Sequence, residues 1–291
     1  MLRLGTRRYP PGTFGIMAIV NRTPDSFYDR GATFAFDQAM QRVHDVVAQG
    51  ADIVDIGGVK AAPGQEVSAA EEIDRTAAFV RAVREAHPDV VISVDTWRHE
   101  VGEAVCAEGA DLLNDAWGGH DPLLVEVAAK HDVGIVCTHA GGATPRTRPH
   151  RIAYDTETGG VMGDVLARTL ALADRAVEVG VDRDRVIIDP AHDFGKNTYH
   201  SLEVTRRLPE MIDTGWPVLV SLSNKDFVGE TLGGLPPGER LTGTLAATAV
   251  CAWLGAVIDR VHNVVETKQT LDMVASIKGD RPPARTIRGL A

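Results

Sequence analysis

The sequence predicts an α/β fold, and within that class a single-domain (β/α)8 barrel, also called a TIM barrel. Its 291 residues exceed by a small margin the roughly 250 residues of one such barrel. Short β-branched runs alternate along the chain with longer segments of helical period, in eight pairs. Because parallel strands need crossover connections, eight pairs with no strand left over close naturally into a ring.

The eight pairs follow one another in order along the chain. We expect strands at residues 14–20, 53–56, 90–94, 112–114, 134–138, 186–189, 218–222 and 261–264. We expect the helices that follow them at residues 36–49, 69–86, 98–108, 122–131, 161–180, 198–208, 241–257 and 267–277.

A doubly wound parallel sheet is the alternative architecture. Such a sheet usually has a glycine fingerprint after its first strand, whereas this chain has Asn21-Arg22-Thr23-Pro24 there. No internal repeat, low-complexity run or linker divides the sequence. We therefore expect one domain over residues 1–291.

Composition and charge disfavour several classes of function. The formal net charge of -10 would repel a phosphate backbone, and the Lys and Arg residues are scattered, so nucleic acid is not an expected partner. The sequence has no run of about 18 uncharged apolar residues and no apolar leader, which predicts a cytoplasmic protein with no membrane partner. Cys106, Cys137 and Cys251 are too few for a disulfide framework and are expected to be reduced thiols.

Polar side chains stand at the end of every expected strand. A single Asp after an apolar run is more often a helix cap or a turn former than a functional group. Polar groups at all eight strand ends make that reading poor, because a barrel brings these ends to one opening. The residues are Asn21, Asp55, Asp95, Asn114, His139, Asp189, Lys225 and the pair Arg260 and His262.

The chemistry of these residues suggests two subsites. Three of them can exchange hydrogen bonds with the amide-rich edge of a heterocycle, and Lys225 adds a proton donor. Asn21, Arg260 and His262 come from the first and last strands, which adjoin in a closed barrel, and together could hold an anion or a metal-bound phosphate. The ring-recognising residues are Asp95, Asn114 and Asp189.

Other motifs are incomplete. Gly195-Lys196 lacks the upstream glycine and the following Ser or Thr of a phosphate loop, so we expect Lys196 to be a surface residue at a helix start. There is no G-x-S-x-G elbow and no evident nucleophile.

Seven blocks of sequence, in the same order, resemble the dihydropteroate synthases, and the resemblance covers nearly the whole chain. Three of these blocks are residues 50–58, 109–115 and 189–196. The other four blocks are Asn21-Arg22-Thr23-Pro24-Asp25-Ser26-Phe27, Ser93-Val94-Asp95-Thr96, Ser223-Asn224-Lys225 and Arg260-Val261-His262.

The resemblance implies a barrel, usually a homodimer, in which p-aminobenzoate displaces pyrophosphate from 6-hydroxymethyl-7,8-dihydropterin diphosphate with the help of Mg²⁺. It implies that the pterin is held by Asp95, Asn114, Asp189 and Lys225. It also implies that the diphosphate is held by Asn21, Asp55, Arg260 and His262, with Asn21 at the Mg²⁺.

The chain departs from the family mainly on the side of p-aminobenzoate. Ala61 and Ala62 replace the Thr and Arg of the loop that closes on this substrate, and Asn224 replaces an Arg that stacks on the pterin. Further departures are Arg22, Arg30, His192, Asp193 and Asn263. We therefore expect a divergent, inactive paralogue with a kept pterin and diphosphate pocket and little or no synthase activity.

Two other functions stay open at this point. One is a working dihydropteroate synthase with a substituted loop. The other is a pterin-dependent methyltransferase, which would share the acidic and amide contacts to the pterin but would not need Arg260 and His262 for a diphosphate.

Overall fold

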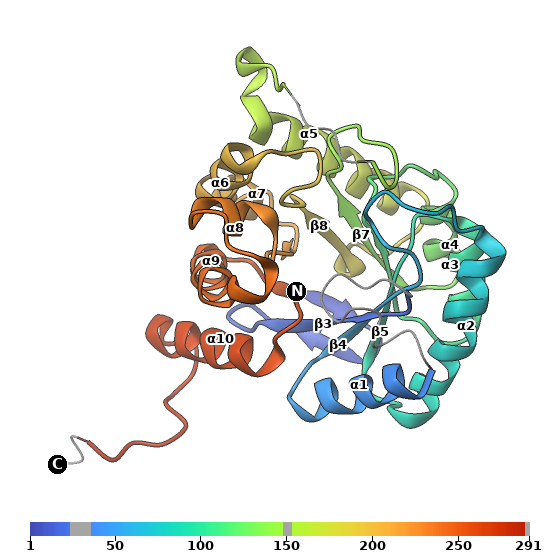
Figure 1. Cartoon of the computed structure of the whole chain (residues 1–291), viewed down its shortest axis with the longest axis horizontal. Coiled ribbons are helices and arrows are strands. Elements are labelled where there is room, and N and C mark those ends of the chain that lie inside the picture. The colour runs from blue at the N-terminus through green and yellow to red at the C-terminus, as the bar shows by residue number, and fades with distance from the viewer. Residues whose placement is uncertain (24–35, 148–152, 289–291) are drawn as a thin grey trace.

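Eight parallel strands form a ring at the centre of the molecule (Figure 1). The computed structural model describes residues 1–23, 36–147 and 153–288. The sheet runs in the order β8-β7-β6-β5-β4-β3-β10-β9, and a parallel bridge from Ile188 to Val218 joins its two ends. The predicted TIM barrel is therefore confirmed. The strands are β3 (Gly15–Asn21), β4 (Ile53–Gly57), β5 (Val91–Asp95), β6 (Leu112–Asp115), β7 (Gly134–Thr138), β8 (Val186–Asp189), β9 (Leu219–Val220) and β10 (Ile258–Val261).

Helices surround this ring (Figure 1). The predicted helix at residues 198–208 is divided, because α6 ends at Arg206 and α7 starts at Leu208. The helices are α1 (Phe36–Ala48), α2 (Ala69–Ala86), α3 (His99–Ala107), α4 (Leu124–Lys130), α5 (Gly160–Glu178), α6 (Thr198–Arg206), α7 (Leu208–Ile212), α8 (Asp226–Thr231), α9 (Leu241–Leu254) and α10 (Val264–Lys278). No helix in these described ranges combines the length and apolar character that crossing a bilayer requires.

The prediction for the eighth strand was wrong by three residues. β10 occupies Ile258–Val261, and α10 already begins at Val264. The sequence pattern did not indicate a strand at these positions, because Asp259 and Arg260 are adjacent charged residues, which are unusual in a buried strand. In the structure both are accommodated, because neighbouring side chains of a strand point to opposite faces: Arg260 reaches the pocket, and Asp259 packs beside α9 and α10.

A short amino-terminal hairpin, β1 (Leu2–Leu4) with β2 (Arg7–Tyr9), was not predicted. Leu2, Leu4 and Tyr9 pack against inward-pointing residues near the starts of the barrel strands. The hairpin therefore closes the amino-terminal end of the ring. Three-residue strands are too short to give a period that can be read from sequence.

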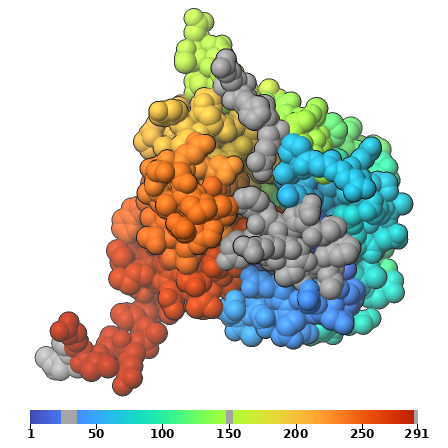
Figure 2. All heavy atoms as spheres, in the orientation of Figure 1, coloured from blue at the N-terminus to red at the C-terminus, as the bar shows by residue number. Residues whose placement is uncertain are grey.

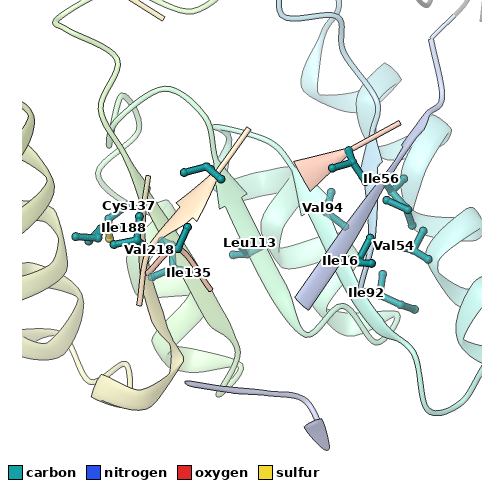
Figure 3. Close-up of a cluster of buried hydrophobic side chains, with 14 of the residues drawn as sticks. Ile16, Val54, Ile56, Ile92, Val94, Leu113, Ile135, Cys137, Ile188 and Val218 are labelled. Atoms are coloured by element: carbon teal, nitrogen blue, oxygen red, sulfur yellow. The ribbon is translucent and has the colours of Figure 1, made fainter. Parts of the chain in front are cut away.

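The core has two layers because successive strand residues point to opposite sides. Outward-pointing residues such as Ile16, Val54 and Ile92 pack between strands and helices (Figure 3). Inward-pointing residues form an apolar floor inside the ring, made of Met17, Ile53, Val91, Leu112, Val136, Ile187, Leu219 and Ile258 with the hairpin residues. Two residues further along β4 and β10, the inward positions become Asp55 and Arg260. The strand register thus places polar groups above the apolar floor.

Candidate functional site

A pocket of about 600 Å³ lies at the carboxyl ends of the barrel strands. This volume suits a small organic ligand, since such pockets usually measure about 300–1,000 Å³. Figure 2 shows this face, with α6 and α8 on one side and α2 with its preceding loop on the other. The predicted site residues in its lining are Asn21, Asp95, Lys225, Arg260 and His262, together with the three substituted positions Ala61, Ala62 and Asn224.

Four of the predicted residues form one hydrogen-bonded group, which we call the inner cluster: Asp55, Asp95, Asn114 and Arg260. Arg260 donates from Nε to Asp55 over 2.6 Å and from Nη2 to Asp95 over 2.7 Å. The fully buried Asp55 also accepts from Ser93 Oγ at 2.6 Å and from Asn114 Nδ2 at 3.4 Å. One guanidinium therefore links carboxylates from β4 and β5.

The electrostatics of the inner cluster leave Asp95 able to change its charge. Burial raises the pKa of Asp95 to about 7, although the cation of Arg260 opposes the shift. Burial lowers the pKa of Arg260, but the two carboxylates outweigh this effect and raise it overall. Near neutral pH Asp95 can therefore either accept a hydrogen bond or, when protonated, donate one to a ligand.

Asp189 and Lys225 face one another from β8 and the segment after β9. Burial raises the pKa of Asp189, and the nearby Lys225 cation opposes that shift. Lys225 donates to the carbonyl oxygen of His192, and its Nζ lies 5.0 Å from the ring centre of Phe194. Phe194 lines the pocket, so Lys225 stands beside a flat aromatic wall.

Asn21 and His262 lie on the neighbouring strand ends of β3 and β10, as predicted. His262 shares a hydrogen bond of 2.9 Å between its Nδ1 and the Oγ of Ser223, which also lines the pocket. Our interpretation of the strand ends missed Ser223. Its place two residues before Lys225 in the Ser223-Asn224-Lys225 block was the signal that could have identified it.

Asn114 and Asp189 are close to the pocket but do not line it. Their residues are only 3% and 6% exposed, and Asp189 accepts a hydrogen bond from the backbone N–H of Ala191 at 2.6 Å. Five predicted residues thus gather at one end of the barrel. Asp95 and Lys225 reach the cavity, and the other three lie behind it: Asp55, Asn114 and Asp189.

The substituted positions offer little to a ligand through their side chains. Ala61 and Ala62 belong to the outer wall of the pocket, which we define as Val59, Lys60, Ala61 and Ala62. Asn224 adopts a left-handed backbone conformation with φ of +58°, which Asn tolerates better than most residues. Its backbone is fixed by Thr244 Oγ1 at 3.2 Å and by Arg240 Nη1 at 2.7 Å.

Two of the other departures serve packing. The Arg22 guanidinium lies 4.9 Å from the ring centre of Phe79 and donates to the carbonyl oxygen of Arg75 at 3.3 Å. His192 is fully buried and stacks on Phe227 at 5.4 Å between ring centres. Asp193, by contrast, lines the pocket. The departure at Arg30 and the motif residues 24–27 lie outside the described residues.

Our prediction that Lys196 is a surface residue was wrong. Its residue is 7% exposed, and its Nζ contacts His139 Nδ1 at 2.6 Å and the carbonyl oxygen of Phe194 at 3.0 Å. Burial lowers the pKa of Lys196 to about 7. The loop after β8 folds around this side chain. Lys196 is also part of the pocket lining.

The barrel mouth is acidic and amide-rich, and it holds a fixed guanidinium and a lysine beside an aromatic wall, which are groups that suit a flat, polar ring. Sequence comparison agrees: the family model described as pterin binding enzyme matches residues 17–262. The chain belongs to the pterin-binding enzymes and, within them, to the dihydropteroate synthase family.

Individual relatives narrow this placement. The chain is 60% identical to a Mycobacterium leprae protein named inactive dihydropteroate synthase 2, over 95% of this chain and 94% of that protein. It is 36% identical to the dihydropteroate synthase of Bacillus subtilis, over 89% and 87% of the two chains. The crystal structure of Yersinia pestis dihydropteroate synthase with a sulfonamide drug gives a TM-score of 0.88 at 32% identity, covering 96% of this chain and 99% of that one.

Proposed function

We propose that this chain binds a dihydropterin, as the free ring or its diphosphate, and has little or no dihydropteroate synthase activity. One observation carries the proposal: the same pocket keeps Asp95, Lys225 and Arg260 but has only alanine side chains at positions 61 and 62 of its outer wall. The name of the Mycobacterium leprae relative supports a loss of synthase activity.

The pterin would lie over the inner cluster and against Phe194. Asp95 and Lys225 would contact it directly, because both reach the cavity. Asn114 and Asp189 would act indirectly, because Asn114 holds Asp55 and Asp189 holds the loop after β8. A ring with several amide-like edges can use a carboxyl group that both donates and accepts.

The diphosphate would occupy the side of the pocket formed by Asn21, Arg260 and His262, with Asp55 orienting Arg260. The donor set fits Mg²⁺, since this ion takes oxygen ligands and is often held by one protein group plus substrate phosphates. Asn21 would supply that group. The ion would neutralise charge on the bound diphosphate, and Arg260 and His262 would position the diphosphate oxygens.

An active dihydropteroate synthase is the second candidate. The size of the pocket and the retained inner cluster favour it. Against it stand Ala61 and Ala62, which cannot hydrogen-bond an incoming substrate through their side chains. A methyltransferase is disfavoured, because Arg260 and His262 both line the pocket and suit a diphosphate.

We further propose that the chain works as a cytoplasmic homodimer. Large apolar side chains are exposed on the adjacent helices α9 and α10, among them Trp253 at 54% and Met273 at 61%. Such side chains on neighbouring helices are typical of surfaces that another subunit covers. Sedimentation of the intact chain would test this, with monomer at micromolar concentration as the contrary result.

Calorimetric titration with 6-hydroxymethyl-7,8-dihydropterin diphosphate, with and without Mg²⁺, tests the binding proposal. We expect saturable binding that Mg²⁺ strengthens. A p-aminobenzoate turnover assay on the same sample then separates the two candidates. Absence of binding contradicts the proposal, and turnover at the rate of the Bacillus subtilis enzyme supports the active synthase.

A further inference from the structure

The segment between β4 and α2 carries the outer wall, and both of its ends are fixed. Near its start, Arg75 Nη1 donates to the carbonyl oxygen of Gly58 at 2.9 Å. Near its end, Arg98 Nη2 donates to the carbonyl oxygen of Val67 at 2.7 Å. Residues 60–66 between these points are held from a different loop.

That contact comes from Arg146, in the segment between β7 and α5. Its Nη1 donates to the carbonyl oxygen of Gln65 at 2.6 Å, and its Nε donates to that of Ala62 at 3.4 Å. Its Nη2 packs 3.1 Å from where a Cβ at Gly64 would stand. The two loops therefore meet above the barrel mouth, although they are more than 80 positions apart in sequence.

The backbone of Arg146 adopts a conformation that its residue type disfavours. Its φ is +62°, in the left-handed region where a Cβ meets the following carbonyl oxygen. Contacts made by the side chain can compensate for such a backbone. The next residue, Thr147, lines the pocket, so Arg146 connects two parts of the pocket rim: Thr147 on its own loop and Ala62 on the other.

We propose that Arg146 is a positioning residue that fixes the outer wall of the pocket through the backbone of Ala62 and Gln65. Both acceptors are carbonyl oxygens, so this contact does not depend on the side chains at positions 61 and 62. The subsite next to the pterin is then a preformed surface instead of a loop that closes through its own Thr and Arg. The inference rests on the proposed function only in assigning that subsite to a second ligand.

Proteolysis at Lys60 tests the proposal without any ligand. Endoproteinase Lys-C cuts after lysine, and Lys60 is in the segment that Arg146 holds. Replacing Arg146 by Ala should raise the rate of cleavage at Lys60 by about tenfold, because proteolysis follows the population of the open loop. Hydrogen exchange of the amides at residues 60–66 should accelerate in parallel.

Two matched variants keep the result interpretable. Arg175→Ala removes an exposed ion pair with Glu126 and should leave cleavage at Lys60 unchanged. Arg146→Lys keeps the charge but cannot make the forked contact, and should give an intermediate rate. Chemical denaturation of each variant reports its global stability. An unchanged rate at Lys60 in Arg146→Ala, within about twofold, overturns the proposal.

A ligand arm separates this inference from the proposed function. If the pterin diphosphate binds, the Arg146→Ala variant should bind it with unchanged affinity. Its cleavage at Lys60 should still be faster than in the unmodified protein. If the unmodified protein does not bind it, the proposed function fails, while the cleavage rates at Lys60 still decide whether Arg146 holds the outer wall.

Discussion

The inner cluster and the outer wall of the pocket are built by different means. The inner cluster stands on strands, so the register of the barrel fixes the distances between Arg260, Asp55 and Asp95. The outer wall stands on a loop that is held through backbone carbonyl groups. Side chains on the wall can change without loss of the fold, whereas a change in the cluster leaves buried charge unpaired. Under the proposed function, this difference explains how a barrel can keep one half of a site and lose the other.

Removal of Arg260 should have the largest effect. Arg260→Ala leaves the fully buried Asp55 without its cation, which should lower the free energy of unfolding by about 3–5 kcal/mol. Chemical denaturation at pH 7 measures this change. Arg260→Lys is the control, since it retains the charge and should lose less. A loss below about 1 kcal/mol would show that the cluster is not a rigid unit.

Restoring the family residues on the other side of the pocket should raise turnover, and a stability cost is expected only from Asn224→Arg, because Arg tolerates the left-handed backbone at this position less well than Asn. Ala61→Thr, Ala62→Arg and Asn224→Arg together should raise any residual synthase turnover by about tenfold to a hundredfold, because they add charge-assisted contacts. Steady-state assays of the triple variant and of each single variant measure the gain. No gain would place the cause elsewhere, with Asp193 in the pocket lining as the next position to revert.

Asp259 allows a comparison within one strand, because it is the unpaired neighbour of the paired Arg260. Burial raises the pKa of Asp259 to about 7 and the neighbouring Thr248 hydroxyl opposes this shift, but neither carboxylate oxygen makes a hydrogen bond of ordinary geometry within the described ranges. A raised pKa in the folded state means that stability is full below about pH 4 and is lost as pH rises through 7. Asp259→Asn should therefore stabilise the protein at pH 8, by about 1–3 kcal/mol, and hardly at pH 4. Equal effects of Asp259→Asn at both pH values would contradict this.

The smallest effect is expected at Arg22, a departure from the family outside the pocket lining. Arg22→Leu should cost about 1 kcal/mol through its contacts with Phe79 and the Arg75 carbonyl group. Pterin diphosphate affinity should not change, and calorimetry on both proteins tests this. A large loss of affinity would mean that the first loop contributes to the site.

Sequence alone predicted what depends on local pattern. The alternation of strands and helices predicted the barrel. The polar residues at the strand ends predicted the inner cluster, because the carboxyl ends of parallel barrel strands meet at one opening. It could not predict the burial of Lys196, which depends on His139, 57 positions away in sequence. Nor could it predict the role of Arg146, whose partners are backbone carbonyl oxygens more than 80 positions away, a group that every residue type carries. It also misplaced β10, since a buried Asp259 beside Arg260 violates strand pattern. The assigned roles of the site residues stay predictions.

The ring of strands has one weak seam. β9 has only two residues, and its link to β8 is the single bridge from Ile188 to Val218. Asp189 ends β8 on one side of this seam, and Lys225 follows β9 on the other. A ligand bound to Lys225 and packed on the loop after β8, which Asp189 holds through Ala191, would brace the two sides of this junction. Pocket occupancy should therefore be measurable as slower amide exchange of Ile188, whose N–H donates to the carbonyl oxygen of Pro217 across the seam.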